Sequence, residues 1–394
     1  MKLPFRRHKA VDYDPSNWPW FTTPPPEWLT GGTGTSTLIG LPALFAVLRL
    51  IASAASMVPL FVYRRTEPGA PADEARDTWQ WELLHRRPAL GTTSASWRAD
   101  LAGSLAANGN YFGRKLRVND PRFDEPRIGE ILTLDPRKVE PKREGGVIVY
   151  HDNTGEKPII RAADEIIHIR TFAEPMSLRG YSPVAIARDM IETALRRQRF
   201  EGRYYVNDAR PGIAIKFGEL VGPDTAKRWV EMLEAEHRGA ENAWRPLVIG
   251  GGAEITPFPV SLEDAQFVEA ARLTIQEIAG IYQVPKAFVG EGGSPTPVDA
   301  WFLKTFCLGP LMAVTDEALS FDAQLFPAED DSLYAEHMMD ALLRPDTKDR
   351  YDAYRLARQG GWITPNEIRK RENLPEVSGG DEIQVTPVGG APNQ

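Results

Sequence analysis

The sequence predicts an α+β protein: a mixed domain comes first, two long helices follow with a small unit between them, and helices end the chain. Three observations predict this class. Short apolar runs typical of strands recur up to about residue 172. Helical periodicity extends over 182–207 and again over 261–284, lengths typical of rods rather than of ordinary globular helices. Signals for the start and the end of helices recur after residue 346.

The composition is that of an ordinary folded protein, and its charge limits the functions to consider. At 394 residues the chain can bury the cores of two or three domains. The formal net charge of −8 argues against a protein that grips DNA tightly, because such proteins neutralise phosphates with lysine and arginine. The one cysteine, Cys307, excludes an internal disulfide and a cysteine-based metal site, and its apolar neighbours favour a buried side chain over a nucleophile.

Residues 1–36 are expected to form an extended arm, because they are rich in Pro, Trp, Gly and Thr and show no periodicity. The tryptophans of this arm, Trp18, Trp20 and Trp28, indicate packing either on a neighbouring subunit or on the chain's own domain. No membrane segment is expected. The most apolar stretch, 38–62, is interrupted by two prolines and an arginine into pieces too short to span a bilayer.

The first domain, 37–180, is predicted to mix helices and short strands. An apolar helix over 42–56 begins it, and a strand over 57–63 follows. A turn is expected at Asn108-Gly109-Asn110, because these residue types favour tight turns. Further helices are expected at 79–85 and 94–107, and further strands at 111–118, 131–134, 147–150 and 166–169.

Two long helices, 181–208 and 261–284, are predicted to run antiparallel to each other. In the first helix, Ser182 is placed as the N-cap and Pro183 as the first helical residue. Its apolar face is expected to consist of Ile186, Met190, Ile191, Ala194 and Leu195. The second helix begins with a capping box on Ser261. Its apolar seam is expected to consist of Val268, Ala271, Ile275, Ile278 and Tyr282.

Between the long helices, residues 209–260 are predicted to form a small β-α-β-β unit at the far tip of the pair. A strand at 213–217 is followed by an amphipathic helix at 223–237 and by two strands, 247–249 and 254–256, around a glycine turn. About fifty residues bury too little apolar surface for an independent core. The unit is therefore expected to complete its sheet or core against a neighbour.

A polar loop follows the second long helix and is expected over Glu291, Gly292, Gly293, Ser294, Pro295, Thr296 and Pro297. A long apolar helix over 298–319, a strand near Leu333 and a helix over 346–359 come next. Thr364-Pro365-Asn366-Glu367 then combines an N-cap, a first-turn proline and a capping-box glutamate, which predicts the last helix. The remaining residues, 376–394, are expected to form a flexible tail.

The order of these segments resembles the HK97-like portal family of tailed bacteriophages over about residues 41–381. Each segment is weak alone, and their ordered succession carries the resemblance. The segments are Ala43–Ala52 with Val58-Pro59-Leu60, Leu83–Pro88 with Asn108-Gly109-Asn110-Tyr111, Gly180–Val184, Ile278–Val289, and Gly360–Pro375 with Gly379-Gly380-Asp381. Two positions depart from the family pattern. Arg87-Pro88-Ala89 stands where Pro-Asn-Pro is common, and Thr296–Asp299 opens a helix that Asn and Glu usually mark.

The resemblance implies a portal fold and, with it, a dodecameric ring at one vertex of a capsid. This ring would be the channel for the packaging and the ejection of viral DNA. The implied parts are an α/β wing at 37–180, an antiparallel two-helix stem at 181–208 and 261–284, a β-α-β-β clip at 209–260, a tunnel loop, tunnel helix and return to the wing at 285–345, and a helical crown at 346–375.

The resemblance also implies partners. These are further copies of the chain, the major capsid protein, the terminase, head-completion or adaptor proteins, and double-stranded DNA bound without sequence specificity. Assembly is implied in the host cytoplasm, and no membrane partner is implied. The loop at 291–297 matches in position the tunnel loop that approaches DNA. Contacts of the clip with its partners are expected at Trp229, Glu231, Glu234 and Glu236.

A channel must let DNA slide, so the acidic balance of the chain suits a mostly acidic wall with local basic spots. The candidates for these DNA-facing spots are Arg196, Arg197, Arg199, Lys286 and Lys304. For the three arginines, ion pairs between neighbouring subunits are an alternative role, and we leave both roles open at this point.

No catalytic residue, metal site or cofactor is expected. The chain lacks a glycine-rich loop that ends in Gly-Lys-Ser/Thr, so the phosphate cradle of a P-loop ATPase is missing. The histidines have no zinc-ligand spacing, and the acidic pairs Asp316-Glu317 and Asp330-Asp331 have no third ligand for Mg²⁺. Two alternatives to a non-enzymatic portal protein remain: a packaging-associated, metal-dependent nuclease or hydrolase, and a capsid scaffold protein without a channel.

Overall fold

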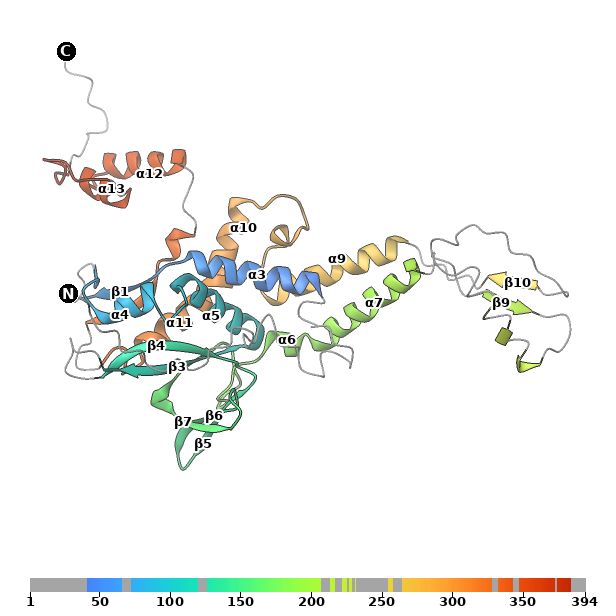
Figure 1. Ribbon diagram of the computed structural model, residues 1–394. Coiled ribbons are helices and arrows are strands. Elements are labelled where there is room, and N and C mark those ends of the chain that lie inside the picture. Colours follow the sequence, from blue (N-terminus) through green and yellow to red (C-terminus); the bar gives the residue numbers. More distant parts are fainter. Residues whose placement is uncertain are drawn as a thin grey trace, which may run out of the picture.

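An α+β body, as predicted, carries two helices that leave it side by side and reach toward a two-stranded sheet (Figure 1). The structure is a computed structural model. It describes residues 41–65, 72–119, 126–206, 213–216, 222–224, 227–228, 231, 254–257, 264–327, 332–342, 347–372 and 374–383. The arm expected over 1–36 lies outside the described residues.

Two packed helices, α3 (Pro42–Met57) and α5 (Ser94–Asn108), form the first core of the body. α5 begins at its N-cap Thr93, whose hydroxyl accepts a hydrogen bond from the backbone N–H of Ser96 at 3.1 Å. The faces in contact are rich in small side chains, which lets the two backbones approach closely; they include Ala54, Ala55, Ala102 and Ala106. Both helices agree with the sequence prediction.

Within the described chain, three antiparallel sheets of three strands each complete the body. In the first sheet, β1 (Leu60–Arg64) lies between β2 (Asp73–Glu74) and β11 (Leu333–His337), so a late strand pairs with an early one. The other two sheets have the strand orders β4-β3-β8 and β5-β6-β7. Their strands are β3 (Asn110–Val118), β4 (Arg127–Leu134), β5 (Val139–Glu144), β6 (Val147–Asp152), β7 (Ile159–Ala162) and β8 (Ile166–Arg170).

The predicted strands are found, and the predicted helix at 79–85 appears as α4 (Trp79–Trp81) running into a π-helical turn, η2 (Glu82–Arg86). Strands β2, β5 and β7 were not predicted. β5 contains a proline and four charged residues, and β7 exposes both of its isoleucines. Both strands lie at the edges of their sheet, where proline and exposed side chains are tolerated.

The first long helix is divided into α6 (Pro183–Ile186) and α7 (Arg188–Val206), which meet at Ala187. Ser182 caps it as predicted and accepts from the backbone N–H of Ala185 at 3.1 Å. The predicted apolar face is wrong at Ile186, whose side chain is 67% exposed. The buried face instead follows a spacing of three and four residues through Val184, Ala187, Ile191 and Ala194, and Ile186 lies to one side of this line.

The second long helix, α9 (Asp264–Ile281), runs antiparallel to α7 and packs on it (Figure 1). The predicted seam is confirmed at Ile278 and Tyr282, which are buried. Arg197 of α7 joins the two helices. Its guanidinium donates to the backbone carbonyl of Ala270 at 2.7 Å and to the hydroxyl of Thr274 at 3.0 Å. The predicted helix start at Ser261 lies outside the described residues.

Beyond the two helices, β9 (Ile213–Lys216) and β10 (Glu254–Pro257) form an antiparallel pair, with Lys216 opposite Glu254. These are two of the three strands predicted for the small unit. The third, at 247–249, lies outside the described residues, and the helix predicted at 223–237 is described only in part.

A long helix follows in three continuous parts: α10 (Pro297–Phe302), the π-helical η6 (Leu303–Leu308) and α11 (Gly309–Ser320). By length and composition alone, Pro297–Ser320 is apolar enough to cross a membrane. In the body, however, this helix contributes buried side chains to two core clusters, among them Leu303, Leu308, Met312 and Leu319. Burial in the core accounts for part of its apolar character, because 28% of its most apolar window is buried and other apolar side chains of the helix are exposed.

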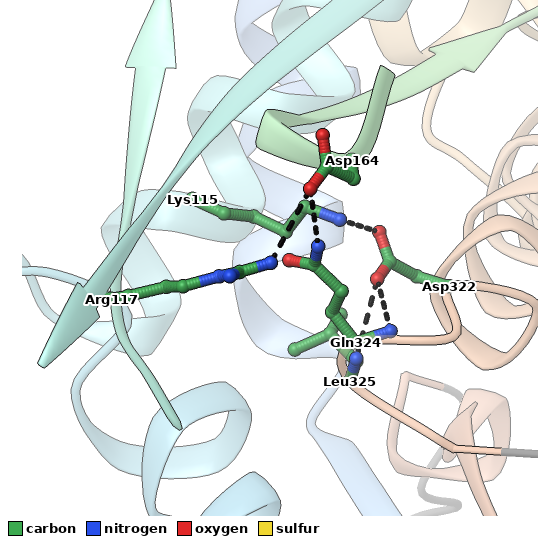
Figure 2. A network of polar contacts seen from close by, with 6 residues as sticks. All are labelled: Lys115, Arg117, Asp164, Asp322, Gln324 and Leu325. Carbon is green, nitrogen blue, oxygen red and sulfur yellow. Dashed lines mark hydrogen bonds and ion pairs between the residues drawn. The ribbon is translucent and has the colours of Figure 1, made fainter. Parts of the chain in front are cut away.

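The end of this helix is attached to the body by a network of polar contacts, which Figure 2 shows. Lys115 of β3 donates to Asp322 at 2.5 Å, and the two side chains are only 3% and 10% exposed. Asp322 also accepts from the backbone N–H groups of Gln324 and Leu325. Gln324 in turn donates to Asp164, 160 residues earlier in the chain. The turn after α11 is thereby held against β3.

The first long helix leaves the body at a close contact between two glycines. A Cβ on Gly109, whose φ is +66°, would lie 1.9 Å from the carbonyl oxygen of Tyr181, and a Cβ on Gly180 would lie 2.3 Å from that of Gly109. Asn110 fixes this contact. Its amide donates to the carbonyl of Gly180 at 2.9 Å, and its side-chain oxygen accepts from the N–H of Gly180 at 2.8 Å. We call Gly109, Asn110 and Gly180 the glycine junction.

Two C-terminal helices, α12 (Thr347–Gln359) and α13 (Pro365–Arg371), pack through Glu372, which accepts from Arg350 at 2.7 Å and from the Tyr354 hydroxyl at 3.0 Å. The capping box predicted for α13 is confirmed.

The first part of the segment expected as a flexible tail, 376–394, contacts α13, and residues 384–394 lie outside the described residues. The side chain of Asn366 donates to the carbonyl of Val377 at 3.0 Å and to Asp381 at 2.9 Å, and it accepts from the N–H of Val377. The backbone N–H of Asn366 donates to the carbonyl of Gly380 at 2.9 Å. Residues 377–381 are therefore held on the first turn of α13.

The glycine junction leads to a first prediction. Gly180→Ala should lower the free energy of unfolding by about 1–3 kcal/mol, because its methyl group would collide with two backbone groups that cannot move independently. Chemical unfolding followed by circular dichroism measures this change. Gly155→Ala is the matched control, because its Cβ would meet no atom closer than 3.8 Å. Equal stabilities of the two variants would contradict the prediction.

The buried His168 leads to a second prediction. Burial, and then the charges of Arg179 and Arg170, lower the pKa of His168 to about 3. Its ring stacks on Phe112 and lies within hydrogen-bond distance of Asn110.

Because the unfolded chain binds the proton more readily, the stability contributed by neutral His168 is present above about pH 6.5 and is lost as the pH falls toward 3. Between these pH values, the free energy of unfolding of the His168→Gln variant should therefore fall less than that of the unmodified chain. Unfolding curves measured at pH 7.5, 5.5 and 4.5 or so test this, and parallel losses in both proteins would refute it.

Candidate functional site

The segment between α9 and α10 is the candidate site, and its backbone is compact. Val284-Pro285 ends the preceding helix, and a 3-10 turn, η5 (Lys286–Val289), follows. Gly290 closes this turn in the left-handed region, with a φ of +87°. The N–H of Glu291 then donates to the carbonyl of Lys286 at 3.0 Å, so the loop begins by turning back on itself.

Two further glycines let the loop stay close to η5. Gly292 and Gly293 have φ values of +88° and +97°, a region that residues with a side chain rarely adopt. A Cβ on Gly292 would lie 3.2 Å from the Cε atom of Lys286, so the lysine stem runs along this glycine. Glu291 lies 3.8 Å from the guanidinium of Arg272 on α9. The predicted loop is thus attached to α9 at its start.

The far end of the loop is fixed by a capping box that we had not recognised. The hydroxyl of Thr296 accepts from the backbone N–H of Asp299 at 3.2 Å, and Asp299 accepts from the N–H of Thr296 at 2.8 Å. The Thr296 hydroxyl also donates to the Asp299 carboxylate at 2.6 Å, and this bond and the one from the Thr296 N–H lower the pKa of Asp299. Pro297, which we expected in the loop, is the first residue of α10. The spacing Thr-x-x-Asp was the signal for this boundary.

The five basic candidates have different partners. Arg196 pairs with Glu192 one turn earlier on α7 at 2.5 Å. Arg197 is used between α7 and α9, as described above, and its Nε lies 3.4 Å from Glu201. Arg199 is exposed.

The two lysines lie near the loop. Lys286 is exposed at the start of η5 and lies over Gly292. Lys304, on η6, donates to the carboxylate of Asp340 at 2.8 Å. Of the five candidates, Lys286 is therefore the one that belongs to the loop itself, and Lys304 is occupied by a carboxylate of its own chain.

Of the expected clip contacts, Glu231 is described: it is helical and exposed, and its carboxylate lies 4.0 Å from Lys227. The other three, Trp229, Glu234 and Glu236, lie outside the described residues.

Some of the residues considered for enzyme chemistry lie in the part of the chain that the structure describes. There, no group of three or more His, Cys, Asp or Glu side chains is placed to hold a metal ion. Asp316, one of the acidic candidates, is occupied by the ring of His337 and by the backbone N–H of the same residue. The pair Asp330-Asp331 lies outside the described residues. Burial raises the pKa of the Cys307 thiol to about 12, which keeps it protonated and a poor nucleophile.

Sequence reasoning missed an apolar surface beside the loop. Trp301, Phe302 and Phe306 are 52%, 38% and 44% exposed, and their rings contact one another. Next to them an open groove of about 400 Å³ lies between the end of α9, η5 and α10. We expected an ordinary apolar helix here. A helix with a single buried stripe does not need aromatic residues on its other side. The surplus of aromatic residues in this helix was therefore the signal in the sequence for a second apolar surface.

Comparison with known proteins identifies the family to which the chain belongs. The family model for phage portal proteins matches residues 42–373 of the chain. A probable portal protein of Streptomyces phage phiC31 is 24% identical over 355 residues, which are 86% of this chain and 75% of that protein. The portal protein of Enterobacteria phage HK97 is 24% identical over 321 residues, which are 78% of this chain and 73% of that protein.

Among solved structures, the fold is similar to that of a chain in the neck of a native gene transfer agent particle, computed with C12 symmetry. The TM-score is 0.57 at 22% identity, and the match covers 90% of this chain and 95% of the other. Because the family model spans most of the chain, from the start of α3 to the end of the described α13 helix, the assignment does not depend on any single segment. The chain belongs to the phage portal protein family.

Proposed function

We propose that the chain is a subunit of the ring-shaped channel at one vertex of a viral capsid, through which double-stranded DNA is packaged and later ejected. The observation that carries this proposal is the match to the portal family over residues 42–373. The similarity to a neck chain in a particle with C12 symmetry supports a ring of identical copies, which we propose to number twelve.

In this proposal the parts of the chain have distinct roles. The body is the wing, the pair formed by α6–α7 and α9 is the stem, and the β9–β10 unit is the clip. The long helix from Pro297 is the tunnel helix, and α12 with α13 is the crown. What supports this division is the order of the elements and the reach of the two helices away from the body (Figure 1).

The partners follow from these roles. The clip would meet the terminase during packaging and the head-completion proteins afterwards, with Glu231 exposed for such a contact. The wing would meet the major capsid protein. The ring would assemble in the host cytoplasm and remain in the virion, at the portal vertex.

The loop at 291–296 would be the part that approaches DNA. Its glycines permit turns close to the axis of a channel without side chains in the path, and Lys286 supplies one positive charge beside it. Glu291 is partly neutralised by Arg272. Together with the formal net charge of −8, this arrangement suits weak, sliding contact with phosphates better than tight binding.

The proposal is not catalytic, and the two alternatives can be separated from it. A metal-dependent nuclease or hydrolase would cleave DNA in the presence of Mg²⁺. A capsid scaffold protein would show no central opening. Neither alternative is favoured by an observation on the described residues.

The direct test is negative-stain imaging of the purified full chain. We expect rings with a central hole, because each copy exposes two different sets of apolar side chains, within 172–186 and within 298–306, and can join its neighbours head to tail. Monomers at concentrations of micromolar order, or closed particles without a hole, would contradict the proposal.

The loop gives a sharper prediction. Removal of Gly292-Gly293-Ser294 should leave the rings intact and reduce the amount of DNA that is packaged or retained, because the deleted residues contribute no buried side chain. Removal of Gly155-Glu156-Lys157, an exposed turn between β6 and β7, is the control of equal length. The length of DNA in purified particles is the measurement. If the first deletion packages as well as the second, the loop has no role at the DNA.

A further inference from the structure

Exposed apolar side chains and a groove are found on α9 and α10. Besides Trp301, Phe302 and Phe306, this part of the chain exposes Val298 on α10 and Leu273 and Ile281 on α9. Phe302 lines the groove of about 400 Å³ together with seven residues between Gln276 and Lys286. Gly280 forms part of its wall, and a Cβ on this glycine would meet no atom within 4 Å. We call this surface the α9–α10 groove. Exposed apolar patches of this kind mark sites of association.

A second apolar surface lies where the first long helix leaves the body. It exposes Phe172, Met176, Tyr181 and Ile186, with exposed fractions of 81%, 91%, 38% and 67%. We call it the α6 edge.

The α6 edge is an ordered structure rather than a set of loose side chains. The N–H of Tyr181 donates to the carbonyl of Phe172 at 2.9 Å, and Arg170 donates to the carbonyl of Ser177. Arg179 donates to the carbonyls of Val139 and Pro136 at 2.6 and 2.7 Å. Met176 has a φ of +66°, which is unfavourable for a residue with a side chain. The loop thus holds apolar side chains outward.

The two surfaces belong to different parts of the helix pair. In Figure 1, α10 lies nearer to α9, and α6 begins the other helix of the pair. Two different patches suit a head-to-tail contact between copies, which closes into a ring when the rotation is right. A twofold dimer would instead need one patch that is complementary to itself.

The charges of the two helices are complementary as well. α7, which continues the α6 edge, carries five arginines and three carboxylates. α9, which borders the groove, carries three carboxylates and one arginine. Arg199 of α7 and Glu269 and Glu277 of α9 are exposed, so Arg199 is available to these carboxylates of another copy, whereas Arg196 already pairs with Glu192 of its own helix. Opposite charges of this kind favour one orientation of the partner over the reverse.

We propose that the α9–α10 groove of one subunit receives the α6 edge of the next subunit, with Ile186 in the hollow at Gly280. The inference rests on the proposed function, because it assumes a ring of identical copies. It assigns Arg199 of α7 to the contact between subunits rather than to DNA. It also explains why Ile186 and the aromatic residues of α10 are exposed in a single chain.

Two variants test the two sides separately. Ile186→Glu places a charge on the edge, and Gly280→Phe fills the groove. Neither should disturb the fold, because Ile186 is exposed and the space at Gly280 is open. Each variant alone should be a folded monomer by light scattering and circular dichroism. Ile160→Glu, at a 60% exposed residue of β7 outside both surfaces, is the matched control and should form rings like the unmodified chain.

The decisive measurement mixes the two variants in equal amounts. The Ile186→Glu chain keeps an intact groove and the Gly280→Phe chain keeps an intact edge, so the mixture should form heterodimers and stop there. Rings formed by either variant alone, or a mixture that stays monomeric, would overturn the inference while rings of the unmodified chain leave the proposed function standing. If the unmodified chain forms no ring, the proposed function fails first.

Discussion

The glycine junction is the constraint on which the rest of the structure depends. Two backbones meet there without side chains between them, at Gly109 and Gly180, and Asn110 satisfies the polar groups that this contact buries. The direction in which α6 and α7 leave the body follows from that contact. Since α9 packs on α7, and α10 begins shortly after α9, the groove and the loop take their positions from the same place.

A second attachment acts at the other end of the long apolar helix. The buried pair of Lys115 and Asp322 holds the turn after α11 on β3, whereas α10 at the start of the helix has a largely exposed surface. Loss of one partner would leave a buried charge without its counterion, which is costly in a dry interior. The helix is thus fixed to the body at one end and presents the loop at the other, with the π-helical η6 between them.

The sequence predicted those parts of the fold that local chemistry determines. The caps at Ser182 and Thr364 and the early strands were readable because turn and cap residues act on their own neighbours. The edge strands β5 and β7 were not, because their charged or exposed residues are stabilised by pairing with β6 rather than by an apolar pattern. Ile186 was misplaced because apolar residues three or four positions apart can be aligned along either of two adjacent faces of the same helix. The buried face is the one that contains Val184 and Ala187.

The candidate site was predicted in position and only partly in form. The loop between α9 and α10 was expected, but its boundary at Thr296 and the groove beside it depend on how three segments meet. Contacts between separate segments cannot be inferred from the residue pattern of any one of them. The roles of Arg196, Lys286 and Lys304 toward DNA stay predictions, and our proposal gives Arg199 a role between subunits instead. Arg197 has a partner across the helix pair that its own helix could not reveal.

The pairing of β1 with β11 has a consequence for folding during synthesis of the chain. Leu60 lies opposite His337, and the second core needs Leu319, Leu325 and Leu333 to bury the apolar side of β1. The ribosome must therefore synthesise the chain through β11 before this sheet and its core can close, and contacts so distant in sequence form slowly. Until then the nascent chain exposes the apolar side chains that Leu319, Leu325 and Leu333 later cover, and such exposed surface favours association between unfinished chains.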